Sequence, residues 1–222
     1  MNIAIIYEDD QILIVDKPTN LLIHPASRLK QKDLLSAIGH HEYGVVTRLD
    51  YQTQGLVLLG KTKNSLSLLS ILQRHNKIKK YYQAIVSGYF PEAEGTYRCY
   101  LLKDEESALV RTASEKIKGS RETITKYRVI EENQELSLVE IELVTGRFHQ
   151  IRAVMAHFNH PLLGDPLYGN KSLNRRYNLN HQALVSMRLE FSDIEREHPL
   201  AYLEGKVFEK GDFPFLNIMK KR

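Results

Sequence analysis

An arginine and an aspartate two positions apart, just before a short apolar run, form the clearest chemical feature of this sequence. Residues 47–61 read TRLDYQTQGLVLLGK and contain Arg48 and Asp50. The apolar residues 56–59 have the length and composition of a buried strand, and residues 53–55 are turn formers. We therefore expect Asp50 in a turn that enters a strand. An ionised carboxylate there needs a cation or hydrogen-bond donors in place of lost water.

A turn aspartate also has a structural interpretation, since Asp is common in turns for local hydrogen-bonding reasons. Taken alone, the triplet of Arg48, Leu49 and Asp50 favours that interpretation. The triplet is accompanied by further blocks in a fixed order along the chain: residues 7–25, 80–88, 145–152, 160–169 and 181–191. Together these blocks are a far more specific signal than any one of them.

The pattern RLDxxTxGLxLLxK at residues 48–61 resembles the active-site motif of the RluA-type RNA pseudouridine synthases. The other blocks are similar to blocks of the same family, so the resemblance covers nearly the whole chain. It implies an α+β (mixed α/β) fold with a largely antiparallel central sheet and flanking helices, the pseudouridine synthase catalytic fold. It also implies an isomerase that converts specific uridines in structured ribosomal or transfer RNA to pseudouridine.

The resemblance assigns catalytic roles to three residues: Asp50, Tyr82 and Arg152. Asp50 aligns with the catalytic aspartate, and Arg152 with the cation that keeps this carboxylate ionised. Tyr82 aligns with the tyrosine that stacks on the base and helps to remove the carbon 5 proton. Whether Asp50 attacks the sugar or the base, or removes the proton from ribose carbon 2, stays open.

Two arginines are expected to bind RNA at this site. The target uridine must be flipped out of its stack, and the resemblance implies that Arg48 fills the space it leaves. Arg147 lies in the TGRFHQIR block, where it serves either as a phosphate contact or as a structural pairing partner. Both alternatives stay open.

Three basic clusters flank the blocks, at residues 61–63, 74–80 and 171–176, and they include Lys61 and Lys80. We expect Lys61 and Lys80 to bind RNA. If the clusters converge on one face, they form the positive surface that phosphate contacts require. For the cluster at 171–176 and the terminal residues 220–222, ordinary solvated surface is the slightly favoured explanation.

Two positions depart from the family pattern. Thr47 stands where the family usually has His, and Gln54 where it usually has Ser. Neither change replaces the carboxylate or the arginine, so we expect the reaction class to be kept while loop packing or the fitting RNA differs. Asp165, in the GDPLYG segment, is expected to form a turn rather than to take part in chemistry.

Composition agrees with one catalytic domain over residues 1–222 without an accessory RNA-binding domain. The chain is 42% hydrophobic, and its net charge of +4 comes from 31 basic and 27 acidic residues. That excess alone does not identify a nucleic-acid binder. No run approaches the ~20 apolar residues that cross a bilayer, and no secretory signal begins the sequence, so we expect a cytoplasmic protein.

No cofactor or metal is expected. The single cysteine, Cys99, cannot form an internal disulfide and is expected to be a buried or half-buried thiol. The nine histidines lack the spacing of a metal motif. Nothing in the pattern requires more than a monomer.

The expected elements are strands with two helices. Residues 3–7 and 12–15 predict a hairpin, and residues 65–74 predict an amphipathic helix. A second helix is predicted over residues 149–158, with Arg152 about one turn inside it and on the same face as His149. Further strands are predicted at residues 81–86, 96–101, 108–112, 123–130 and 136–144.

A different class of function is also compatible with basic blocks of this kind, namely a non-catalytic RNA-binding or RNA-folding protein on the same scaffold. Such a protein has no need for Asp50, Tyr82 and Arg152 together, which favours the enzyme. A glycosidase is a weaker alternative, because the sequence offers one good carboxylate where that chemistry normally uses two.

Overall fold

The computed structural model describes residues 3–24, 33–104 and 109–220. The predictions made for residues 25, 108, 221 and 222 lie outside these ranges. The chain forms two compact units. Unit 1 comprises residues 1–80 and 185–212, and unit 2 comprises residues 81–184 and 213–222.

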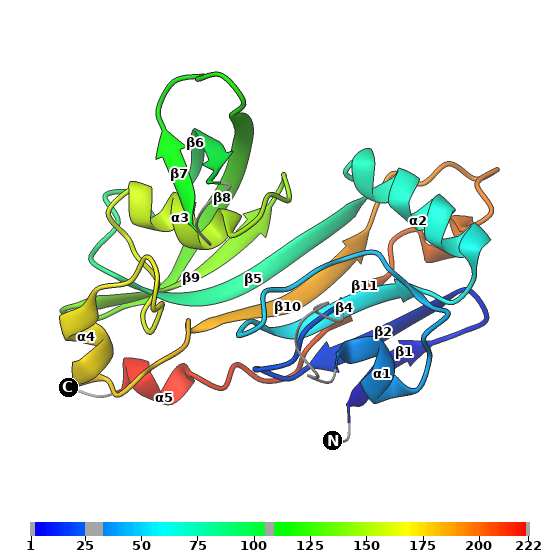
Figure 1. The fold of residues 1–222 in the computed structure, drawn as a ribbon, viewed down its shortest axis with the longest axis horizontal. Helices are drawn as coiled ribbons and strands as arrows, with labels where there is room; N and C mark the ends of the chain where they lie inside the picture. The colour runs from blue at the N-terminus through cyan, green and yellow to red at the C-terminus, as the bar shows by residue number, and fades with distance from the viewer. Residues whose placement is uncertain (1–2, 25–32, 105–108, 221–222) are drawn as a thin grey trace. The chain divides into compact units, whose positions relative to one another are not determined.

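Unit 1 is built on a small mixed sheet (Figure 1). The predicted hairpin is confirmed, and its second strand pairs antiparallel with the strand that follows the Asp50 turn. A two-residue strand also pairs antiparallel with that strand, and a strand late in the sequence pairs parallel with it. The strands are β1 (Ala4–Glu8), β2 (Ile12–Lys17), β3 (Gly44–Val45), β4 (Gln54–Gly60), β10 (Leu184–Phe191) and β11 (Val207–Glu209), which pairs antiparallel with β10.

Helix α2 (Lys63–Arg74) covers one face of this sheet and confirms the predicted amphipathic helix (Figure 1). It begins with a capping box in which Thr62 and Ser65 satisfy each other's backbone N–H groups. Leu69 and Leu72 are buried in a core with residues of β2, β4 and β10. Burial of this leucine face anchors the helix. Unit 1 also contains α1 (Leu34–Ile38) and the 3-10 helix η1 (Ala201–Leu203).

Gly55 allows β4 and β10 to approach closely. Its φ is 114°, a conformation that residues with a side chain rarely adopt. A Cβ atom at this position would lie 2.2 Å from the carbonyl oxygen of Ser186 on β10. The glycine in the RLDxxTxG pattern therefore sets the path of the backbone that enters β4.

Unit 2 contains an antiparallel ladder in the order β5-β9-β8-β6-β7, so the expected largely antiparallel α+β fold is confirmed. The pairs are antiparallel throughout this ladder. The strands are β5 (Ile78–Ser87, its first three residues belonging to unit 1), β6 (Glu94–Lys103), β7 (Val110–Ala113), β8 (Arg121–Glu132) and β9 (Leu136–Leu143).

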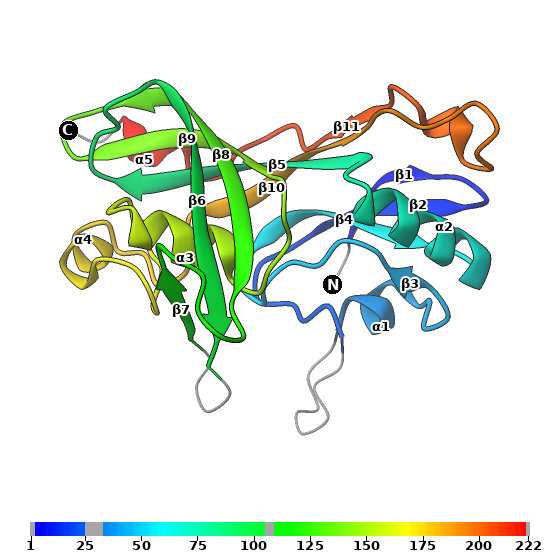
Figure 2. The same ribbon diagram turned by 90° about the horizontal axis from the view of Figure 1, so that it is seen from above.

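Helix α3 (Gln150–His157) confirms the second predicted helix and lies beside β6 and β7 (Figure 2). Ala153 and Val154 pack against Cys99, Leu101 and Val110. The thiol of Cys99 is buried, as expected. Two shorter helices, α4 (Lys171–Arg176) and α5 (Leu216–Met219), belong to the same unit.

Helices α1, α4 and α5 were not predicted. They have four to six residues each. Segments this short complete little more than one turn and show no amphipathic repeat. Among the described residues, no helix has the length and apolar character required to span a membrane.

Candidate active site

Asp50 lies in a tight turn immediately before β4, as predicted. Its carbonyl oxygen accepts a hydrogen bond of 3.1 Å from the N–H of Thr53, and β4 begins at the next residue. Asp50 is half-buried. Arg48 is exposed, and within the described ranges its guanidinium forms no ion pair. The turn therefore contains a half-buried aspartate and an exposed arginine from the same short segment.

A buried lysine holds this turn in place. Lys17, at the end of β2, is 0% exposed, and its ammonium group donates hydrogen bonds of 2.9, 2.9 and 3.3 Å to three carbonyl oxygens, those of Pro18, Leu21 and Tyr51. Close by, Thr19 Oγ1 donates to the carbonyl oxygen of Gln52 at 3.0 Å. The segment after β2 is thus bonded to the two residues that follow Asp50.

The pKa of the Lys17 ammonium group depends on its burial and on two nearby carboxylates. Burial lowers its pKa to about 8, against an opposing effect of the Asp50 and Asp16 carboxylates. No role was predicted for Lys17 from the sequence. The sequence around Lys17 could have indicated its burial, because a lysine that ends the apolar strand ILIVDK and precedes a proline has little access to water.

In unit 2, Arg152 and Asp165 form a buried ion pair. Their side chains are 5% and 0% exposed, and two parallel hydrogen bonds of 2.7 and 3.0 Å join the guanidinium to the carboxylate. Asp165 also accepts the backbone N–H groups of Leu167 and Tyr168 at 2.8 and 3.0 Å. The turn role expected of Asp165 is confirmed, but the expectation missed its larger role as the carboxylate partner of Arg152.

The electrostatic balance of this pair favours the ionised form of Asp165. Burial raises the pKa of its carboxyl group, but the hydrogen bonds and charge of Arg152 and the two backbone donors outweigh burial and lower the pKa below the usual value. The Arg152 guanidinium also lies 5.3 Å from the ring centre of Tyr168. Arg152 is therefore fixed in orientation within unit 2.

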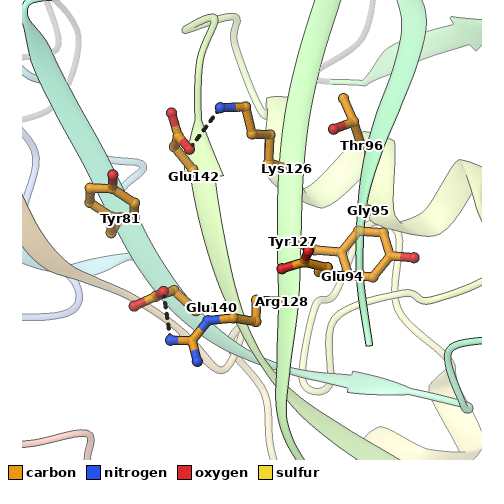
Figure 3. A pocket seen from close by; sticks show the side chains of 9 residues that line it. All are labelled: Tyr81, Glu94, Gly95, Thr96, Lys126, Tyr127, Arg128, Glu140 and Glu142. Atoms are coloured by element: carbon orange, nitrogen blue, oxygen red, sulfur yellow. Dashed lines mark hydrogen bonds and ion pairs between the residues drawn. The ribbon is translucent and has the colours of Figure 1, made fainter. Parts of the chain in front are cut away.

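Tyr82 is 5% exposed and lies on β5 opposite Ile141 of β9. Its neighbour Tyr81 points to the other face of the ladder, where a concavity of about 390 Å³ opens (Figure 3). Four of the five charged side chains that line this concavity form cross-strand pairs of 3.0 Å, Lys126 with Glu142 and Arg128 with Glu140. None of the residues predicted to be catalytic lines it.

The remaining predicted RNA-binding residues differ in exposure. Lys61 pairs with the Glu8 carboxylate at 2.7 Å, so its charge is locally compensated. Lys80 is 6% exposed, and burial lowers its pKa. Arg147 is exposed and, in the part of the chain that the structure describes, has no ion-pair partner. Arg147 is therefore the most accessible cation of the three.

Several members of the basic clusters are also compensated within their own unit. Lys77 pairs with Glu195, and Lys79 with Glu190 at 3.6 Å. In unit 2, Arg176 pairs with Glu135. These exposed pairs reduce the positive potential that the sequence suggested, and convergence of the clusters on one face stays a prediction.

The two departures from the family pattern have local structural partners. Thr47 is buried, and its hydroxyl oxygen accepts the N–H of Leu58 at 2.8 Å, so it fastens the segment before Asp50 to β4. Gln54 is half-buried at the start of β4, aligned with Val185 of β10. Among the described residues, no group of three or more His, Cys, Asp or Glu could hold a metal ion.

Comparison with known proteins places these residues in a family. The family model described as RNA pseudouridylate synthase matches residues 11–157, so the chain belongs to that family, and the RluA-type resemblance is confirmed. An uncharacterized RNA pseudouridine synthase of Mycoplasma pneumoniae is 34% identical over 76% of this chain and 56% of its own length. Ribosomal large subunit pseudouridine synthase D of Neisseria meningitidis is 33% identical over 91% of this chain and 58% of its own length. The chain thus spans less than two thirds of these relatives.

A solved structure supports the fold. Human RNA pseudouridylate synthase domain containing 1 matches with a TM-score of 0.76 and 22% identity, covering 98% of this chain and 86% of that chain. At this identity the likeness shows a shared fold.

Replacing the Lys17 ammonium tests the support of the Asp50 turn. We expect Lys17→Met to lower the free energy of unfolding by about 2 kcal/mol or more, because three carbonyl oxygens lose their buried donor. Urea denaturation measures the change. Lys63→Met, an exposed position in the first turn of α2, serves as the control and should stay within about 0.5 kcal/mol of the native chain. Equal stability of the two variants would contradict the role assigned to Lys17.

Replacing Asp165 tests the buried ion pair and predicts a pH dependence. Because the folded-state pKa of Asp165 lies below its unfolded value, its contribution to stability is complete above about pH 4 and is lost as pH falls through the folded-state pKa. Asp165→Asn should cost about 3–5 kcal/mol at pH 7, since it removes the negative charge from a buried ion pair and weakens the two hydrogen bonds to Arg152.

The difference in unfolding free energy between native chain and Asp165→Asn should shrink as pH is lowered from 5 to 2.5. Asp212→Asn removes a carboxylate from an exposed pair and should cost less than about 1 kcal/mol at any of these pH values. A pH-independent difference for Asp165→Asn would argue against an ionised carboxylate at this position.

Proposed function

We propose that this chain is an RNA pseudouridine synthase, an isomerase that converts uridine in structured RNA to pseudouridine. The observation that carries the proposal is Asp50, which lies in the family-matched region on a turn held by a buried lysine. The names of the N. meningitidis relative and of a 34% identical relative from Buchnera aphidicola refer to the large ribosomal subunit. Their names favour ribosomal over transfer RNA as the substrate class.

The reaction breaks the bond between ribose carbon 1 and nitrogen 1 of uracil, turns the base and joins its carbon 5 to ribose carbon 1. Carbon 5 loses a proton and nitrogen 1 gains one, so no redox partner or energy source is required. In our proposal, Asp50 starts this sequence as a nucleophile toward the sugar or base, or as a base at ribose carbon 2. Asp50 lies in a turn and is only half-buried, which is compatible with contact to a bound nucleotide.

Tyr82 and Arg152 have supporting roles in this proposal. Arg152 is the cation that the family pattern assigns to the catalytic site, and its orientation is set by Asp165 and Tyr168. Tyr82 stacks on the uracil ring and assists removal of the carbon 5 proton. Its burial in β5 suits an aromatic ring that must hold one position.

RNA binding in the proposal rests on four cations, of which Arg48 and Arg147 are exposed. Arg48 enters the space left by the flipped uridine, since its guanidinium is exposed two residues from Asp50. Arg147, Lys61 and Lys80 contribute phosphate contacts. In the proposal, residues 1–222 form one catalytic domain and the protein is a monomer. We expect it in the cytoplasm with its RNA.

Mapping of pseudouridine in total RNA tests this function. RNA is taken from cells that lack the protein and from the same cells carrying the native chain or Asp50→Ala. We expect one or more discrete sites to disappear without the protein, to return with the native chain and to stay absent with Asp50→Ala. The backbone hydrogen bond from Thr53 to the carbonyl oxygen of Asp50 is retained in the variant, and circular dichroism of purified Asp50→Ala verifies that it is folded.

An unchanged set of sites, together with ribosome or growth defects that Asp50→Ala rescues as well as the native chain, would contradict the enzyme. That result would place the protein among non-catalytic RNA-binding or RNA-folding proteins.

A further inference from the structure

An aromatic side chain is presented to solvent in the loop just before α3. Phe148 is 46% exposed, unlike the apolar residues of the unit 2 core. Its ring stacks on the imidazole of His149, with ring centres 3.8 Å apart and an angle of 21° between the planes. One face of a phenyl ring is thus supported by a second ring while the side chain remains accessible.

The support beneath Phe148 is continuous with the buried ion pair. His149 Nδ1 lies 3.2 Å from the hydroxyl oxygen of Tyr168, which also accepts the N–H of Val110 at 2.8 Å. The Tyr168 ring in turn lies 5.3 Å from the Arg152 guanidinium carbon. Phe148 therefore sits at the outer end of a chain of contacts whose inner end is a proposed catalytic residue.

Two exposed cations flank the ring. The ammonium of Lys103, near the end of β6, lies 5.7 Å from the centre of the Phe148 ring, and Arg147 precedes Phe148 in the chain. Over the described residues, neither side chain has an ion-pair partner. An apolar ring with the Lys103 ammonium over it and Arg147 next to it in the chain matches a ligand that combines a flat aromatic face with negative charge.

We propose that Phe148, with Lys103 and Arg147, is a stacking platform for an unpaired base of the RNA substrate. The proposal rests on the proposed function and adds a contact that selects RNA with an unstacked base. Nucleobases stack on exposed aromatic side chains while lysine and arginine neutralise the adjacent phosphates. A single ring with two cations offers little to an apolar peptide.

Equilibrium binding of a single-stranded probe tests the platform. The affinity of the full chain for a fluorescein-labelled oligouridylate of about twelve nucleotides is measured by fluorescence anisotropy. We expect Phe148→Ala to weaken binding by roughly 5- to 150-fold, the effect of losing one stacked base. Phe148→Tyr keeps the ring and should bind like the native chain. Ile130→Ala, which truncates a 43% exposed side chain on β8, is the matched control and should change nothing.

The salt dependence separates stacking from charge. Phe148→Ala should leave the slope of log affinity against log salt concentration unchanged, whereas Lys103→Ala should reduce it by about 0.7, the value for one phosphate contact on a single strand. Equal affinities of Phe148→Ala and the native chain would overturn the platform, as would a loss of affinity shared by Ile130→Ala. Absence of any binding by the native chain would overturn it as well.

Assays of pseudouridine formation and of probe binding, made on the native chain and Phe148→Ala, separate a failure of the platform from a failure of the proposed function. If the native chain forms pseudouridine while Phe148→Ala binds the probe normally, the platform is wrong and the enzyme stands. If the native chain forms no pseudouridine but Phe148→Ala binds the probe more weakly, the platform stands as an RNA contact and the enzyme is wrong.

Discussion

The buried ammonium of Lys17 is the interaction on which the candidate site in unit 1 depends. A charge with 0% exposure must have its hydrogen bonds made by the protein, and here carbonyl oxygens from two separate segments provide them. Neither segment can move away without leaving a buried donor and acceptors unpaired. The turn that carries Asp50 is therefore positioned by the end of β2, 34 residues earlier in the chain, as well as by its own hydrogen bond to Thr53.

A second buried cation organises unit 2 in a comparable manner. Arg152 is held by the Asp165 carboxylate and the face of Tyr168, and Tyr168 also contacts the loop that presents Phe148. One network thus reaches from a charge in the core to an aromatic ring at the surface. In each unit, a buried cation fixes the polar groups around it. Lys17 and Asp165 therefore matter for positioning these groups, although neither was predicted to belong to the site.

Much of the fold could be predicted from local pattern, whereas the contacts of the site could not. Alternating and continuous apolar runs located β1, β2, β4, α2 and α3, and the turn formers before β4 placed Asp50 correctly. The roles of Lys17 and Asp165 depend on partners 34 and 13 residues away, and no local pattern specifies such pairs. The catalytic roles of Asp50, Tyr82 and Arg152 came from a family resemblance, because an aspartate in a turn and a tyrosine in a strand are common in proteins of every function.

Release of tritium from RNA carrying uridine labelled at carbon 5 is the most direct test that this chain forms pseudouridine by means of Asp50. The label at carbon 5 is released only if the base is rejoined to the ribose through that carbon. Purified native chain and Asp50→Asn are compared on ribosomal and transfer RNA transcripts, and the dissociation constant of each protein for the same RNA is measured alongside. We expect the native chain to release tritium and Asp50→Asn to slow this release by roughly 10⁴-fold or more, with nearly unchanged affinity for the RNA. Equal release by both proteins would contradict the catalytic role of Asp50, and RNA binding without release by the native chain would contradict the enzyme.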